Sequence, residues 1–237
     1  MTAQASGGGW NILPLHLDSM VYPDWHPRFG DVGPVYAYVV KDDQHLILVD
    51  TGIGPEHPII DRLYHPTRRD LATALAQNNG IAIEDIDAVV ISHLHFDHVG
   101  GTQAFRGTPV YAQRVEWEAA QEPKYTIPAF LEFPGANFVM LDGDTEFAPG
   151  LRLVVTAGHT PGHQVVAVSA PTGTLVLAGQ IVETKAEMAG FVSTGELRDW
   201  SKDGSQTERL AGARKVLDLD PATVWFSHDH QPWEAGQ

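Results

Sequence analysis

The stretch Ile91–Gly101 reads ISHLHFDHVGG and places three histidines and one aspartate within six consecutive residues. It continues the apolar run Ala88–Ser92, whose composition predicts a short buried strand. If the extended conformation persists, His93 and His95 point to the same side, and both imidazoles can reach one ion. The stretch therefore predicts one half of a metal site, and the other half must lie elsewhere in the chain.

Two further groups of histidines lie where an apolar strand is predicted to run into a polar loop. One is AGHTPGH, with His159 and His163, and the other is SHDH, with His228 and His230. Three such groups predict side chains that converge from rigid strand ends on a metal site. The remaining histidines stand alone and are interpreted as surface or capping residues: His16, His26, His45, His57 and His65.

Composition narrows the possible functions. The 237 residues carry 30 acidic and 15 basic side chains, a net charge of −15, which disfavours a nucleic-acid partner because such binding depends on Lys and Arg. There are no cysteines, so a metal must be held by His, Asp, Glu or amide oxygen. No apolar run approaches the roughly 20 residues that span a bilayer, and the start resembles no secretory signal. We expect a soluble cytoplasmic protein that does not enter membranes, either a monomer or a homodimer.

The order of predicted elements favours two packed sheets flanked by helices in a single domain, 1–237, with residues 1–10 as a candidate disordered segment. Residues 35–40 and 46–50 read as a hairpin. The other predicted strands and helices are 88–92, 109–112, 138–141, 151–156, 164–169, 174–178 and 223–227 for strands, and 67–79, 115–121 and 207–219 for helices. Residues 123–138, with three prolines, read as too broken for regular structure.

The motif His93-x-His95-x-Asp97-His98, followed by a Gly-His159 loop and a late His228, resembles the metallo-β-lactamase superfamily. The resemblance extends from the DTG segment at Asp50 to SHDH and covers most of the chain. It implies an α+β fold, a four-layer αβ/βα sandwich with metals at the sheet edges.

The resemblance also implies roles for individual residues. His93, His95 and His159 would hold a first metal ion. Asp97, His98 and His228 would serve a second, and Asp50 would accept a hydrogen bond that orients a ligand histidine. His163 is interpreted as a structural neighbour of the ligands, and His230 is the local competitor of His228.

The chain departs from the family pattern at Gln180. The family usually carries a bridging aspartate in a Leu-x-Gly-Asp segment, and this chain reads LAGQ at 177–180. Gln is neutral and bridges two divalent ions poorly, so Gln180 is the weakest candidate ligand. Three readings stay open: a single metal, two metals with Asp97 and a hydroxide carrying the negative charge, or a substitution that weakens activity. Glu183 is a weaker candidate replacement.

The donors predict a hydrolase. A divalent ion on three neutral imidazoles lowers the pKa of a bound water to about 7, and Asp97 is placed to orient that water and carry its proton. Zinc is the expected metal, with manganese, iron or cobalt as alternatives. The sequence motif HLHFDHVGG looks most like the lactonase and esterase branch of the superfamily, which includes acyl-homoserine lactonases. We therefore expect the substrate to be a small, partly apolar ester or lactone.

Other functions stay open beside this expectation. The same donors fit a glyoxalase-II-like thioesterase, a phosphotriesterase, or a lyase or dehalogenase on the same fold. A metal-binding protein with little catalysis is a further possibility, because Gln180 replaces the usual aspartate. Three stretches are expected to wall the substrate pocket: 20–29, 125–138 and 183–200.

Overall fold

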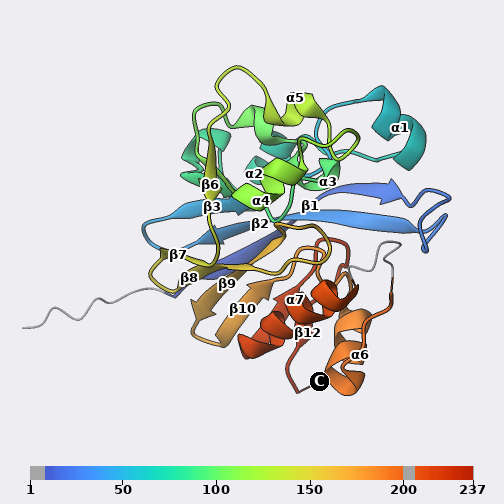
Figure 1. The fold of residues 1–237 in the computed structure, drawn as a ribbon. Coiled ribbons are helices and arrows are strands. Elements are labelled where there is room, and N and C mark those ends of the chain that lie inside the picture. The colour runs from blue at the N-terminus through green and yellow to red at the C-terminus, as the bar shows by residue number, and fades with distance from the viewer. Residues whose placement is uncertain (1–8, 200–205, 237) are drawn as a thin grey trace, which may run out of the picture.

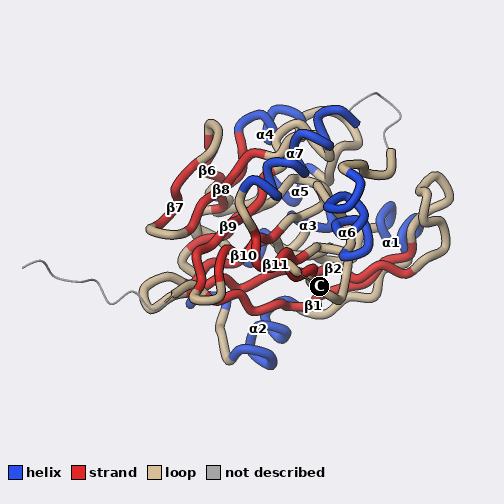
Figure 2. The backbone as a smooth tube through the Cα atoms, turned by 90° about the horizontal axis from the view of Figure 1, so that it is seen from below, coloured by secondary structure: helices blue, strands red, loops and turns tan. Residues whose placement is uncertain are grey.

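Two six-stranded sheets lie face to face, with helices on the outer side of each, in a computed structural model that describes residues 9–199 and 206–236. Figure 1 shows the helices within residues 58–131 above the first sheet, and the helices at 185–194 and 206–218 below the second sheet. Seen from below, the strands gather in the middle and the helices lie around them (Figure 2). The expected α+β, four-layer αβ/βα sandwich is confirmed.

The first sheet follows the chain order from one edge to the other. Its first three strands are antiparallel, and β3 to β6 are parallel. The strands are β1 (Asn11–Val21), β2 (Val32–Lys41), β3 (Leu46–Val49), β4 (Ala88–Val90), β5 (Val110–Gln113) and β6 (Phe138–Leu141). Because β3 and β4 are parallel neighbours, their carboxyl ends lie side by side, and the loops after them start at one edge of the sheet.

The second sheet is mostly antiparallel, with one parallel pair, β10 and β11. Its order is β12-β11-β10-β9-β8-β7. The strands are β7 (Thr145–Ala148), β8 (Leu151–Val155), β9 (Gln164–Ala170), β10 (Gly173–Leu177), β11 (Pro221–Trp225) and β12 (Trp233–Glu234). The loops after β8, β10 and β11 carry the second and third histidine groups and Gln180 toward the first sheet.

The helices are short, and local signals mark their ends. In α2, Asp70 accepts the Thr73 N–H at the start, and Gly80 closes the end in a left-handed conformation. The helices are α1 (Pro58–Tyr64), α2 (Leu71–Asn79), α3 (Phe96–Val99), α4 (Arg114–Ala119), α5 (Pro128–Leu131), α6 (Lys185–Thr194) and α7 (Gln206–Asp218), with 3₁₀ turns at Ile83–Asp85 and Thr102–Ala104. None of the helices in the described ranges has the length and apolar character needed to cross a bilayer.

Three apolar layers hold the sandwich together. In β2, Val35, Ala37 and Val39 face the helices, whereas Tyr38 and Val40 face the second sheet. This alternation follows from the two-residue period of a strand. The layer between the sheets joins these residues to side chains of the second sheet such as Leu153 and Val166, and a third layer lies under α6 and α7. Burial on both faces explains why these strands read as continuous apolar runs.

Several elements depart from the sequence-based expectation. The long strand β1 was not predicted, nor were α1, α6, β7 and β12. Within 123–138, expected to be irregular, Pro128–Leu131 forms the short helix α5. At the N-terminus residues 1–8 lie outside the described residues, whereas Trp10 is buried and its indole donates to the Pro149 carbonyl at 2.9 Å.

Candidate metal centre

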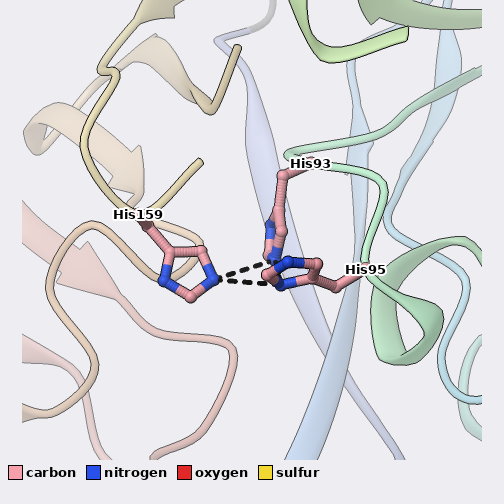
Figure 3. Close-up of side chains that lie close together, drawn as sticks. All are labelled: His93, His95 and His159. Atoms are coloured by element: carbon pink, nitrogen blue, oxygen red, sulfur yellow. Dashed lines mark hydrogen bonds between the residues drawn. The ribbon is translucent and has the colours of Figure 1, made fainter. Parts of the chain in front are cut away.

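The first donor group consists of His93, His95 and His159, which meet across the two sheets. His93 and His95 lie in the loop after β4, and His159 lies in the loop after β8. Figure 3 shows the three rings converging, with His159 Nε2 3.2 Å from His93 Nε2 and 3.3 Å from His95 Nδ1. His93 Nε2 and His95 Nδ1 are 3.1 Å apart. Three ring nitrogens from two distant segments thus point at one small volume.

The protonation of these rings suits a cation. Burial lowers the pKa of all three, and neighbouring histidines lower the pKa of His93 and His159 further. The Ser92 hydroxyl lies 3.1 Å from His93 Nδ1 and donates to Asp50, so it can accept the Nδ1 proton. His93 Nε2 then keeps its lone pair for the centre of the group. Neutral, convergent imidazoles are the donors that zinc takes in proteins, and the residues fit such an ion.

The second donor group consists of Asp97, His98 and His228, all buried. Asp97 Oδ2 lies 3.6 Å from His98 Nε2 and 3.4 Å from His228 Nε2. His228 Nδ1 donates to the Pro34 carbonyl at 2.8 Å, whereas its Nε2 is buried without a hydrogen-bond partner among the described residues. Burial lowers the pKa of His228 to about 4, so this nitrogen carries a lone pair. An orphaned acceptor beside a carboxylate is the second observation that fits a cation.

His98 is held by Asp50, which occupies a left-handed conformation at φ 61° directly after β3. Asp50 Oδ2 accepts from His98 Nδ1 at 2.8 Å, and its other oxygen accepts the Ser92 N–H at 2.7 Å. Burial lowers the pKa of His98, but Asp50 and then Asp97 outweigh it and raise the value to about 9. Without an ion, His98 is therefore an imidazolium between two carboxylates, and a cation binding to its Nε2 must displace that proton.

A side chain at Gly100, the residue after α3, is excluded by steric contact with the loop after β3. A Cβ on Gly100 would lie 2.1 Å from the carbonyl oxygen of Ile53. The Thr51 N–H donates to the His98 carbonyl at 2.7 Å in the same contact. Glycine thus lets the loop after β3 close on the helix that carries His98.

Gln180 reaches the second group, and His163 lies behind it. Gln180 Oε1 is 3.0 Å from His98 Nε2, and the Gln180 N–H donates to His163 Nε2 at 3.1 Å. His163 Nδ1 lies 2.8 Å from the Thr156 hydroxyl, and burial lowers the pKa of His163 to about 3. Both nitrogens of His163 are therefore used within the fold. A Cβ on Gly179 would lie 2.5 Å from His163 Nε2, which explains the glycine before Gln180.

Glu116 in α4 connects the loops that carry the first donor group, and sequence reasoning missed it. Its fully buried carboxylate accepts from Leu94 N–H at 2.8 Å, Thr160 Oγ1 at 2.7 Å and Gly162 N–H at 3.0 Å. The Tyr125 hydroxyl donates to the same carboxylate. One side chain thereby fixes the His93/His95 loop against the His159 loop. The sequence does not indicate this role, because the helix buries the acid Glu116 and exposes the neighbouring apolar Val115.

A cavity of about 300 Å³ opens on both donor groups. Aromatic and aliphatic side chains form much of its wall. It is lined by Met20, Tyr22, His26, Tyr64, His95, Phe96, Asp97, Lys124, Tyr125, His159, Gln180 and Glu183. Each of the three stretches expected to wall the pocket contributes, although Trp200, at the end of the third, lies outside the described residues.

The remaining histidines lie outside the two donor groups. His57 and His65 flank α1 as its terminal caps, and His26 stacks on Tyr22 with ring centroids 4.3 Å apart. His230 Nδ1 lies 2.9 Å from the Tyr36 hydroxyl. The structure therefore places His228, and not His230, with Asp97 and His98.

The sandwich and its two adjoining donor groups are typical of metallo-hydrolases, and the comparisons with known proteins identify the class as the lactonase type. The family description "Metallo-beta-lactamase superfamily" matches residues 30–228. An N-acyl homoserine lactonase of Bacillus cereus is 33% identical over 216 residues, covering 83% of this chain and 81% of the relative. The chain belongs to the metallo-β-lactamase superfamily.

Solved structures show the same fold. A quorum-quenching N-acyl homoserine lactone lactonase has a TM-score of 0.74 at 26% identity, covering 96% of this chain and 95% of that one. AidC, described as a dizinc quorum-quenching lactonase, has a TM-score of 0.70 at 18% identity, covering 96% and 90%. At 18% identity, the likeness to AidC extends to the fold alone.

Proposed function

We propose that the protein hydrolyses a carboxylic ester or lactone of a small, partly apolar molecule in the cavity over the two donor groups. The observation that carries the proposal is the convergence of three neutral imidazole nitrogens from two distant loops, two of them on His95 and His159 in the wall of a cavity with aromatic side chains. The curated relatives named N-acyl homoserine lactonases support the choice of a lactone.

We propose zinc as the metal, with His93, His95 and His159 as its first binding position. Asp97, His98 and His228 form the second position, where Gln180 Oε1 contributes at most a neutral oxygen. When bound, such an ion lowers the pKa of water and polarises a carbonyl oxygen. Manganese, iron or cobalt would supply the same chemistry with these donors.

Asp97 is the proposed acid–base residue. It lies in both the cavity wall and the second donor group. Burial raises the pKa of Asp97, but His98 and His228 outweigh this and hold it below the ordinary value, so the carboxylate is ionised. An ionised carboxylate accepts a proton from attacking water and, once protonated, can donate it to the leaving alkoxide.

The cavity wall fits a partly apolar substrate. Met20, Phe96 and Tyr125 contribute apolar surface beside the donors. The Tyr125 hydroxyl is engaged by Glu116, and its ring lies 5.1 Å from the His95 ring, centroid to centroid. Tyr125 is thereby fixed as part of the wall. A cavity of about 300 Å³ has room for a lactone ring with a short apolar substituent.

Thioester and phosphotriester hydrolysis use the same donors, and a lyase or dehalogenase could be built on them. The alternative of another class, a metal-binding protein with little catalysis, is favoured by one observation. Gln180 places a neutral amide against His98 Nε2 and leaves Asp97 as the sole carboxylate of the second group.

One experiment separates these functions. The purified chain is analysed for bound metal before and after chelation, and each form is assayed on matched γ-lactone, alkyl ester, thioester and phosphotriester substrates. We expect lactone turnover that is lost on chelation and restored by zinc. Bound metal without turnover of any substrate would reject the hydrolase and leave the metal-binding protein.

A further inference from the structure

A separate cavity of about 490 Å³ lies against the end of α3 and shares no described lining residue with the metal cavity. We call it the arginine cavity after three of its lining residues, Arg68, Arg69 and Arg106. Part of its wall is the contact between Thr51 and Gly101, where the Thr51 hydroxyl accepts the Gly101 N–H at 3.1 Å. The same hydroxyl donates to the His98 carbonyl at 2.9 Å. A ligand in the arginine cavity therefore lies close to the backbone that holds a metal donor, but outside the proposed reaction site.

Two of the three arginines keep N–H donors that the fold does not use. Arg68 and Arg69 come from the segment before α2, and Arg106 comes from the turn before β5. Arg68 is paired, because its Nη2 donates to Asp61 Oδ1 at 2.6 Å. Arg69 is exposed and uses Nη1 on the His16 carbonyl at 2.9 Å, which leaves other N–H groups of its guanidinium open. Arg106 is exposed and has no hydrogen bond or ion pair among the described residues. Arg69 and Arg106 therefore present open guanidinium donors from two separate segments.

The acidic side chains of the arginine cavity are mostly engaged elsewhere. Asp18 is 4% exposed and accepts two backbone N–H groups, at 2.8 and 3.1 Å. Asp70 accepts the N–H of Thr73 at 2.8 Å and its hydroxyl at 2.6 Å, at the start of α2. Glu56 is exposed and has no partner among the described residues. The open cations thus outnumber the open acid two to one.

The total charge limits the kind of anion that fits. Three arginines face three acids in the lining, so the formal charges balance. A dianion such as phosphate is disfavoured beside three carboxylates, whereas one carboxylate can pair with the two open guanidinium groups. Apolar surface completes the cavity, from Leu17, Pro55, Leu71 and Ala104. The lining therefore favours a single negative charge on a molecule with an apolar part.

We propose that the arginine cavity is a second small-molecule site, which binds a monocarboxylate with a short apolar chain. Arg69 and Arg106 donate to the carboxylate, because a planar guanidinium matches the two oxygens of a carboxylate. The apolar chain of the ligand lies against Leu17 and Leu71. Such a ligand joins the segment before α2 to the turn before β5, and it stabilises the folded chain because it does not bind the unfolded one. The proposal does not depend on the proposed hydrolysis, which uses the other cavity.

The test measures binding to the metal-free protein by calorimetry, with pentanoate as the probe. Pentanol, which has the chain without the charge, and inorganic phosphate, which has the charge without the chain, are the matched comparisons. We expect pentanoate to bind with a Kd of about 1 mM and the other two to bind at least tenfold more weakly. Thermal unfolding gives a second readout, in which pentanoate should raise the Tm and pentanol and phosphate should not.

Variants place the binding in the arginine cavity. Arg106→Gln removes an exposed, unpaired cation, so the variant should fold with an unchanged Tm and bind pentanoate about tenfold to a hundredfold more weakly. Arg106→Lys keeps the charge but not the planar donors and should lose less. Arg62→Gln is the matched control, because Arg62 is an exposed arginine of α1 outside the cavity lining, and it should bind pentanoate as the natural chain does.

Three results would overturn the proposal. The first is no binding of pentanoate to the natural chain. The second is equal affinity for pentanoate in Arg106→Gln and Arg62→Gln, which would place the probe elsewhere on the protein. The third is binding of pentanol or phosphate as tight as that of pentanoate, which would exclude a monocarboxylate as the preferred ligand.

Discussion

The two donor groups lie side by side but differ in charge. His93, His95 and His159 are neutral, because burial lowers their pKa values, and their nitrogens lie 3.1 to 3.3 Å apart. The second group already contains charged side chains, with His98 as an imidazolium between the carboxylates of Asp50 and Asp97. A cation enters the first group without displacing a proton, whereas in the second it must replace the proton on His98 Nε2. The first group should therefore bind metal more tightly than the second. Gln180 is neutral and adds no negative charge that would help the second group to bind a cation.

The largest expected effect is a loss of turnover in a variant of the second group that still binds zinc at the first. Asp97→Ala removes the acid–base carboxylate, so we expect lactone turnover to fall about 10²- to 10⁴-fold. The first group keeps its three imidazoles, and the variant should still bind about one zinc per chain. Activity assays and metal analysis on the same preparation measure both. Full activity in the variant would remove Asp97 from the mechanism.

A substitution outside both groups should weaken the first one. Glu116→Gln replaces a carboxylate that accepts from both loops of the first group with an amide that cannot accept from all four donors. We expect zinc affinity to fall about tenfold to a hundredfold, the usual cost of losing a residue that orients metal ligands. Competition with a zinc chelator gives the affinity, and Glu118→Gln, an exposed acid of the same helix, is the control. Equal affinity in both variants would show that Glu116 does not position the ligands.

An acidic side chain at position 180 should make the metal affinity of the second donor group more like that of the first. In Gln180→Asp a carboxylate replaces the amide near His98 Nε2, and its charge offsets the repulsion between two divalent ions. We expect metal content to rise toward two per chain, with a change in lactone turnover. Gln180→Asn is the neutral control of equal length. Unchanged stoichiometry in the aspartate variant would mean that the amide does not limit the second position.

The smallest expected effect is a pH dependence in the metal-free protein. His163 has a pKa of about 3 when folded, against about 6.5 when unfolded, so below pH 6.5 the unfolded chain binds a proton that the folded chain excludes. Its contribution to the free energy of unfolding is present above pH 6.5 and is lost as the pH falls toward 3. From pH 7.5 to 5 the natural chain should lose about 2 kcal/mol more stability than His163→Asn. Urea denaturation with a chelator present measures this, and a pH-independent difference between the two proteins would contradict it.

The sequence predicted the fold and the donor-bearing segments because several buried strands end in polar side chains. Ala88–Val90 leads to His93, and Pro221–Trp225 leads to His228, as the apolar runs indicate. Strand β1 escaped prediction because Pro14 interrupts its alternating pattern. The fold tolerates Pro14 because β1 lies at the edge of its sheet.

The role of Glu116 and the burial of the Glu183 carboxyl group could not be predicted from the sequence, because both depend on the folded structure. Glu116 reads as the acid of an exposed helix, yet the helix buries it and exposes Val115. Its donors Thr160 and Gly162 lie more than forty residues away in the chain. Glu183 lies three residues from Gln180, but the sequence does not show that its Oε2 is buried and has no hydrogen-bond partner among the described residues.

The most direct test of the central claim is a calorimetric zinc titration of the metal-free protein and two single-ligand variants. The difference between the groups predicts that His159→Ala abolishes the tightest zinc-binding step, and that His228→Ala preserves it while weakening or removing a second step. The reverse result, with tight binding retained in His159→Ala and lost in His228→Ala, would contradict the account.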